Sequence, residues 1–98
     1  MTTDGSAESA DHLTGLRAEV RQLRQAIASH IVVDQAIGVV IVLGRLTPDQ
    51  GWDVLKEVSQ HTNTKLRDIA GQVVGWANGR PLPDRTRGAL DSALERTA

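Results

Sequence analysis

The sequence predicts an all-α protein, in which a long N-terminal coiled-coil helix runs into a three-helix bundle and a short helix ends the chain. Apolar residues recur at helical spacing along most of its length, most regularly over residues 66–77. A helix start is predicted at residues 47–50, where Thr, Pro, Asp and Gln follow one another, and a helix stop at the two prolines of residues 80–83. We divide the chain into a leader (1–11), a coiled-coil segment (12–30), a three-helix domain (31–79) and a linker with a short amphipathic helix (80–98).

Length and composition restrict the possible functions. A chain of 98 residues has room for one small domain, and a net charge of -1 gives it no overall attraction for polyanions. The lack of cysteine excludes disulfides and thiolate chemistry. The N-terminus has no signal-peptide pattern, and the longest apolar run, residues 39–43, is too short to cross a bilayer. We therefore expect a cytoplasmic protein without a membrane partner.

The N-terminal region has two parts. Residues 1–11 are small, polar and acidic, and we expect them to be disordered. After them, apolar residues are spaced by three and four positions in turn, as in the a/d seam of a coiled coil; they are Leu13, Leu16, Val20, Leu23 and Ile27. Glu19 and Arg24 take g and e positions that attract each other in a parallel pair. This seam predicts a homodimer, and the alternative is an amphipathic helix packed on its own domain.

Residues 31–43 are rich in Val and Ile, whose propensity alone would favour a strand. No turn residue separates this stretch from the seam, so we predict one long helix that ends near Gly44. Gly38 lies inside that helix, where glycine costs about 1 kcal/mol relative to alanine. A close helix crossing at Gly38 would explain its presence.

Three further helices are predicted. The second covers residues 48–60, with Trp52 on its apolar face. The third begins near Leu66 and has Gly79 at its C′ position. The last begins near Asp84, and it either docks on the body or frays.

No residue pattern indicates catalysis or metal binding. The three histidines are scattered, and only His30 with Asp34 has the spacing of a ligand pair. The sequence has no local motif for a nucleophile beside a base and no glycine-rich phosphate loop. We expect no enzyme activity, no metal and no cofactor.

Basic residues indicate a binding function instead. Lys56, Lys65 and Arg67 can converge across the turn between the second and third helices, and Arg45 can extend the group. Such a cluster contacts phosphates, and two copies in a dimer double it. The alternative is a solvated face whose charge is neutralised by three acidic neighbours. These neighbours are Asp53, Glu57 and Asp68.

Three segments in register resemble one known family. They are HIVVDQAIG at residues 30–38, GWDVLK at residues 51–56 and NTKLRDIAGQV at residues 63–73. In this order and at this spacing they resemble the ANTAR family, small RNA-binding domains of bacterial transcription antitermination regulators. The resemblance covers about residues 13–77, which is most of the part expected to fold.

The resemblance implies a coiled-coil dimer whose heads bind a pair of RNA hairpin loops and so prevent a terminator from forming. It makes Ala36 and Gly38 close-packing positions, and it makes Trp52 an anchor of the core rather than a platform for base stacking. It places Gln35 near the loop bases and the basic residues on phosphates. It also leads us to expect that any signal comes from another regulatory protein, because 98 residues leave no room for a sensor domain.

Two positions depart from the family pattern. His30 stands where the family usually has Arg, and Ile37 stands where it usually has Lys. Both changes remove permanent positive charge, which favours an alternative function: a module of the same fold that recruits a partner protein through Ile37 and the coiled coil. DNA binding as a helix-turn-helix is a third hypothesis, and the weakest, because Asp68 and Gly71 on the third helix are poor readers of base edges.

Overall fold

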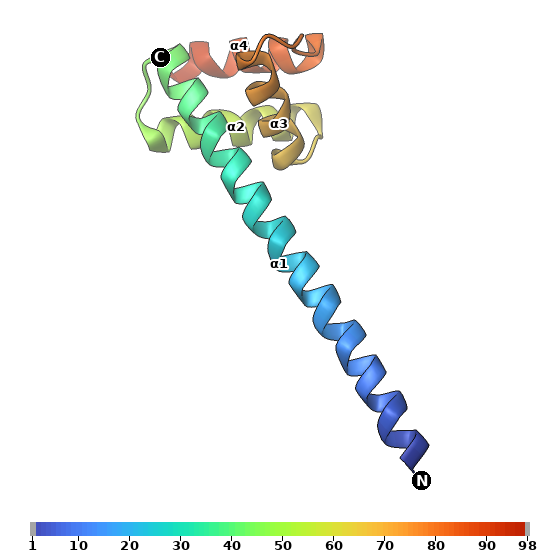
Figure 1. Ribbon diagram of the computed structural model, residues 1–98. Coiled ribbons are helices and arrows are strands. Elements are labelled where there is room, and N and C mark those ends of the chain that lie inside the picture. Colours follow the sequence, from blue (N-terminus) through green and yellow to red (C-terminus); the bar gives the residue numbers. More distant parts are fainter. Residues whose placement is uncertain (1, 98) are drawn as a thin grey trace.

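The computed structural model describes the backbone of residues 2–97 and the side chains of residues 10–97. These residues form four α-helices and no strand, so the prediction of an all-α fold is confirmed (Figure 1). The helices are α1 (Thr2–Gly44), α2 (Pro48–Thr62), α3 (Leu66–Ala77) and α4 (Asp84–Thr97). α1 projects as a rod from a head that consists of its own C-terminal part and the other three helices. The molecule is therefore elongated, with extents of 68 × 25 × 24 Å.

The rod is longer than the sequence suggested. We expected residues 1–11 to be disordered, but α1 begins at Thr2, and Met1 lies outside the described residues. Once a helix exists, each added residue gains a backbone hydrogen bond without a new nucleation cost, and Ala7, Glu8 and Ala10 are good helix formers. The stretch of residues 31–43 is helical, as predicted.

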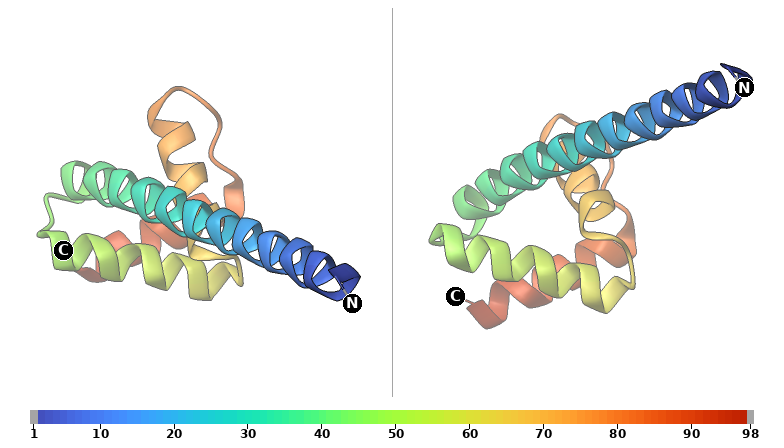
Figure 2. Two further views of the ribbon diagram at one scale, coloured as in Figure 1. Left: turned by 60° about the horizontal axis from the view of Figure 1, so that its bottom comes forward. Right: turned by 90° about the horizontal axis from the view of Figure 1, so that it is seen from below.

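The core of the head is aliphatic. α1 contributes Val33, Ala36 and Val40, which share one face of the helix, and α2 lies between α1 and α4 (Figure 2). The remaining core residues are Leu46, Val54, Leu55, Val58, Ile69, Ala70, Val73, Leu90 and Ala93. Neither tryptophan is fully buried. The fully buried core therefore consists of branched and small side chains, and Trp76 packs against it from the edge.

Part of α1 is long and apolar enough to cross a membrane, judged by length and composition alone. The sequence analysis missed this because polar residues such as His30 and Asp34 interrupt the apolar run. The core helix of a bundle passes the same test, and Val33, Ala36 and Val40 of this helix belong to the core of the head. Only 17% of the apolar window is buried, so packing within the head explains a small part of the apolar composition of α1.

Local signals set both ends of α2. At its start, the backbone N–H of Gln50 donates to Thr47 Oγ1 at 3.2 Å, and the backbone N–H of Thr47 donates to Gln50 Oε1 at 2.9 Å. This is the predicted capping box, with Pro48 in the first turn. At its end, Asn63 adopts a left-handed conformation with φ of 51°. The turn that follows brings the start of α3 back towards α1.

α4 docks on the body, which resolves the alternative that the sequence left open. Leu90 and Ala93 are fully buried, and Thr86 Oγ1 donates a hydrogen bond of 2.6 Å to Gln72 Oε1 on α3. Arg96 Nε donates to a carboxylate oxygen of Glu57 on α2 at 2.8 Å. The head is consequently a four-helix unit, whereas we had assigned residues 80–98 to a linker and tail outside a three-helix domain.

The close crossing of helices occurs at Gly51 rather than at Gly38. A Cβ atom built on Gly38 would meet nothing within 4 Å, so the predicted crossing there is wrong for a single chain. A Cβ atom on Gly51 would lie 3.2 Å from Ile41 and 3.3 Å from Ile37, both on α1. Gly51 on α2 therefore lets α1 and α2 approach, and Gly44 at the end of α1 is a second close position, where a Cβ atom would lie 2.8 Å from Leu94 on α4.

Replacing Gly51 tests this approach. We expect Gly51→Leu to lower the free energy of unfolding by about 1–3 kcal/mol, because the new side chain must displace α1. Gly71→Ala, in open space on α3, is the matched control and should raise it by about 0.5–1 kcal/mol. Urea titration followed by circular dichroism measures both. Equal midpoints for Gly51→Leu and the unaltered protein would show that α1 and α2 do not need a glycine here.

Candidate functional site

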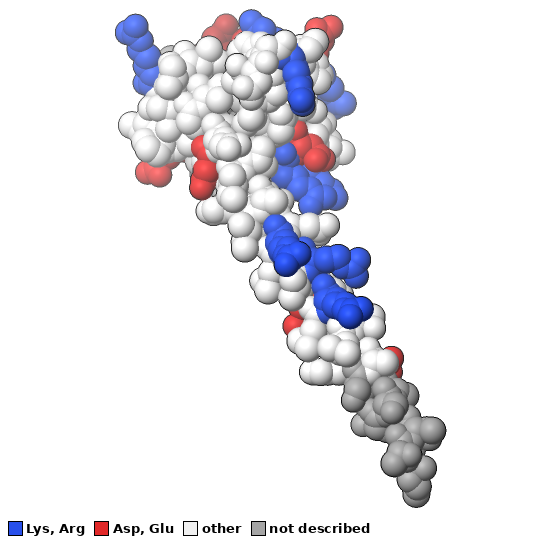
Figure 3. Space-filling model, viewed as in Figure 1, with Lys and Arg blue, Asp and Glu red and all other residues white. Residues whose placement is uncertain are grey.

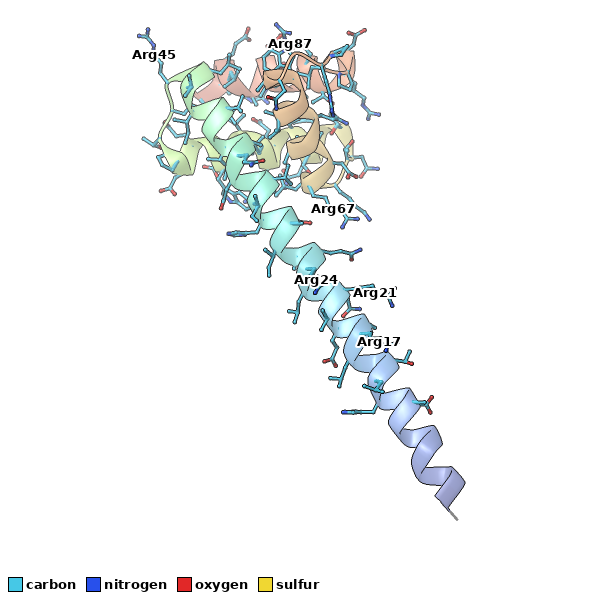
Figure 4. All side chains as sticks on the ribbon, in the orientation of Figure 1. Arg17, Arg21, Arg24, Arg45, Arg67 and Arg87 are labelled. Atoms are coloured by element: carbon cyan, nitrogen blue, oxygen red, sulfur yellow. The ribbon has the colours of Figure 1, made fainter. Side chains whose placement is uncertain are left out.

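The predicted seam is an exposed apolar stripe along the rod. Its five residues, Leu13, Leu16, Val20, Leu23 and Ile27, are between 43% and 63% exposed. Within residues 10–97 no other helix covers them, so they do not pack on the protein's own domain. Arg17, Arg21 and Arg24 lie along the rod beside the stripe (Figures 3 and 4). The rod thus presents a narrow apolar face flanked by positive charge.

This apolar face continues onto the head. Ile31 is 53% exposed and Val42 is 80% exposed, and helical spacing through Gln35 and Gly38 joins them. Gln35, Gly38 and Val42 line a shallow hollow together with Val39 and Leu43. Gly38 therefore lies on the free face of α1, away from the core face.

A larger groove lies where α1 leaves the head. Its volume is about 720 Å³, and its three walls come from α1, from α2 and from the start of α3. Val33 and Ile37 on α1, Trp52 on α2 and Leu66 on α3 form its apolar surface. The polar and remaining lining residues are Ala26, Ser29, His30, Asp34, Lys65 and Arg67. The groove combines apolar walls with charged edges.

Three of the predicted RNA-binding residues gather at this groove. Lys65 and Arg67 line it directly, at the N-terminus of α3. Lys56 lies one turn after Trp52 on α2, with its Nζ 6.0 Å from the centroid of the indole ring. These cations lie on both sides of the turn between α2 and α3, and their role in RNA binding stays a prediction.

The charges of these three cations are not neutralised by ion pairs. Among residues 10–97, no carboxylate lies within 4.0 Å of Lys56, Lys65 or Arg67. Glu57, which we had considered as a neutralising neighbour, binds Arg96 and lies 3.8 Å from His61 instead. Glu57 is therefore not available to neutralise these cations, and Asp34 is the acidic residue that lines the groove with Lys65 and Arg67.

The other two predicted RNA-binding residues lie elsewhere. Gln35 lines the shallow hollow on the free face of α1, whereas the groove contains its neighbour Asp34. Arg45 follows α1 in a left-handed conformation, with φ of 55°, and points away from the head at the end opposite to Arg67 (Figure 4). The five residues predicted as one site thus divide among three places.

Trp52 is not an anchor of the core. It is 39% exposed and lines the groove, contrary to the role that the family resemblance implied. The core face of α2 is set by Gly51, Val54, Leu55 and Val58, which are all buried. Trp52 follows Gly51 by one residue and is therefore turned by about 100° from that face.

The family resemblance directed attention to His30 and Ile37 on the α1 wall of the groove, whereas Val33 and Asp34 were not among the predicted binding residues. His30, Val33, Asp34 and Ile37 follow the i, i+3, i+4, i+7 spacing that places residues on one helix face. His30 Nε2 and Asp34 Oδ2 are 3.7 Å apart, and both side chains are exposed. Within the described residues, no three His, Asp or Glu side chains come together as a metal site would require.

Comparisons with known proteins identify the fold. Over residues 21–74, more than half of the chain, the sequence matches the family described as ANTAR domain. The chain belongs to the ANTAR family. All residues that line the groove fall within this matched range, whereas α4 falls outside it.

A solved structure agrees with this assignment. The ANTAR chain is similar to a protein described as an RNA-binding light-oxygen-voltage receptor, with a TM-score of 0.61 and 30% sequence identity. The similarity covers 85% of this chain and 24% of the receptor chain. A search of curated proteins gave no match.

Proposed function

We propose that this chain is a dimeric RNA-binding regulator of transcription antitermination, and that its heads bind a pair of RNA hairpin loops. The observation that carries the proposal is the group of three unpaired cations, Lys56, Lys65 and Arg67, at the edge of one groove in an ANTAR domain. A structurally similar protein is described as RNA-binding, which supports the same conclusion.

Phosphate binding by these residues is physically reasonable despite the net charge of -1. A polyanion responds to local positive charge as well as to the total, because charges more than about 8 Å apart are largely screened at physiological ionic strength. Lys65 and Arg67 belong to the groove, and the side chain of Glu57 is engaged by Arg96 on the far side of α2. The groove therefore offers RNA a locally positive surface.

Dimerisation through the rod would place two heads together. All five residues of the predicted seam are exposed, as expected for a coiled-coil helix without its partner helix. In a parallel pair the two heads lie at the same end of the rod, so that two grooves face one RNA. This arrangement matches the two adjacent loops of the proposed target.

The groove cations can be tested by substitution. We expect Lys65→Ala/Arg67→Ala to weaken binding to an RNA with two adjacent hexanucleotide loops. The slope of log K against log salt should fall in magnitude by about 0.7 for each phosphate that the variant no longer binds. Fluorescence anisotropy of labelled RNA across a salt titration measures both quantities.

The matched control for this test is Arg85→Ala/Arg87→Ala, which removes the same charge on α4, outside the groove. It should leave the affinity and the salt slope close to those of the unaltered protein. If both double variants lower the affinity equally, general charge and not the groove determines binding.

The seam can be tested in the same way. We expect Leu16→Glu/Leu23→Glu to convert the dimer into a monomer, because two carboxylates per chain would face each other in the apolar seam. Gln22→Glu/Gln25→Glu, on the opposite side of α1, adds the same charge and should leave a dimer. Sedimentation velocity distinguishes the two. A Leu16→Glu/Leu23→Glu variant that is still dimeric would place the interface elsewhere.

A further inference from the structure

Trp52 is an exposed aromatic residue in a head whose core is aliphatic. Its indole is 39% exposed and forms one wall of the 720 Å³ groove. Trp76, in contrast, packs against the hydrophobic core, and the guanidinium carbon of Arg87 lies 4.9 Å from the centroid of its ring. Trp52 is not part of the buried core, and the part of its side chain that lines the groove is available for a ligand.

The groove has the size and composition of a site for a small flat group. Its volume lies within the range of about 300–1,000 Å³ that is usual for small-molecule pockets. Trp52, Val33 and Ile37 supply apolar surface from two helices. Ser29, His30 and Asp34 supply hydrogen-bond donors and acceptors from the same side as Ile37.

The cations show which kind of flat group the groove suits. Lys65 and Arg67 line the α3 wall, and Lys56 Nζ lies over the ring of Trp52, 6.0 Å from its centroid. An apolar peptide would leave these three charges without partners. A nucleotide would give each wall its own partner, with the base against Trp52, the polar edge of the base at α1 and the phosphate at α3.

We propose that the groove holds one unpaired RNA base, stacked on Trp52, while Lys65 and Arg67 hold the adjoining phosphates. This inference rests on the proposed RNA-binding function and specifies how a loop is bound. Trp52 is then a binding residue, and Ile37 supplies apolar surface from α1. Base stacking does not depend on salt as phosphate contacts do, so the two contributions can be measured separately.

Substitution of Trp52, combined with altered RNA, tests the proposal. Binding of the two-loop RNA is compared for the unaltered full chain, Trp52→Leu and Trp52→Phe, and then repeated with RNA whose loop bases are replaced by abasic sites. We expect Trp52→Leu to weaken binding of the intact RNA by about tenfold or more, and Trp52→Phe to retain most of the affinity. For the abasic RNA the three proteins should bind equally.

Fluorescence provides a second measurement that does not depend on the Trp52 variants. In Trp76→Phe, Trp52 is the sole tryptophan of the chain. Intact RNA should quench its emission, because a stacked base contacts the indole directly. Abasic RNA of the same charge should leave the emission unchanged.

The possible outcomes separate this inference from the proposed function. Salt-dependent RNA binding that is equal for Trp52→Leu and the unaltered protein, without quenching in Trp76→Phe, would overturn the base site and leave RNA binding intact. A lack of RNA binding by the unaltered protein at low salt would overturn both, and the groove would then be examined for a protein partner. Circular dichroism of each variant establishes that its helices are intact.

Discussion

The close packing of α2 on α1 at Gly51 determines where the binding groups of this protein lie. A Cβ atom at this position would meet the side chains of Ile37 and Ile41. The backbone of α2 at Gly51 therefore packs directly against side chains of α1. Ile37 lines the groove on α1, and Trp52 is the residue next to Gly51 on α2. The contact that fixes the helix pair therefore also places an indole and an aliphatic side chain in the same groove. The turn after α2 then brings Lys65 and Arg67 to the third wall.

One face of α1 packs in the core of the head, and another face carries the exposed apolar stripe. Val33, Ala36 and Val40 are buried in the head, whereas the stripe from Leu13 to Ile27 is exposed. The stripe extends through Ile31, Gln35 and Gly38 to Val42. Beyond Ile27 its residues are spaced by four, four, three and four positions, and the extra step of four locally unwinds the supercoil of a coiled coil. A helix pair that follows this stripe would reach the head itself, so that pairing and groove geometry are mechanically connected through one rigid element.

Local signals in the sequence were reliable, and signals that depend on three-dimensional packing were not. The capping box at Thr47 and Gln50 and the left-handed Gly79 were predictable because a few neighbouring residues determine each. The roles of Gly38, Gly51 and Trp52 were not, because a glycine or an indole in an amphipathic helix can lie on either side of the boundary between core and surface. α4 could not be placed from its own weak pattern, since the surface that buries Leu90 and Ala93 is formed by other helices.

The few positive charges at the groove limit how strongly it can bind phosphates. The three cations at the groove, Lys56, Lys65 and Arg67, can make only a few phosphate contacts, and salt strongly weakens each such contact. The two positions that lack the family's basic residues, His30 and Ile37, both line the groove, where they supply a hydrogen-bonding edge and an apolar wall. A surface of this composition gains more from contact with a base than from further phosphates. In the proposed dimer, pairing of two heads would raise the effective concentration of the second groove on an RNA held by the first, so that a chain with a net charge of -1 could retain a polyanion.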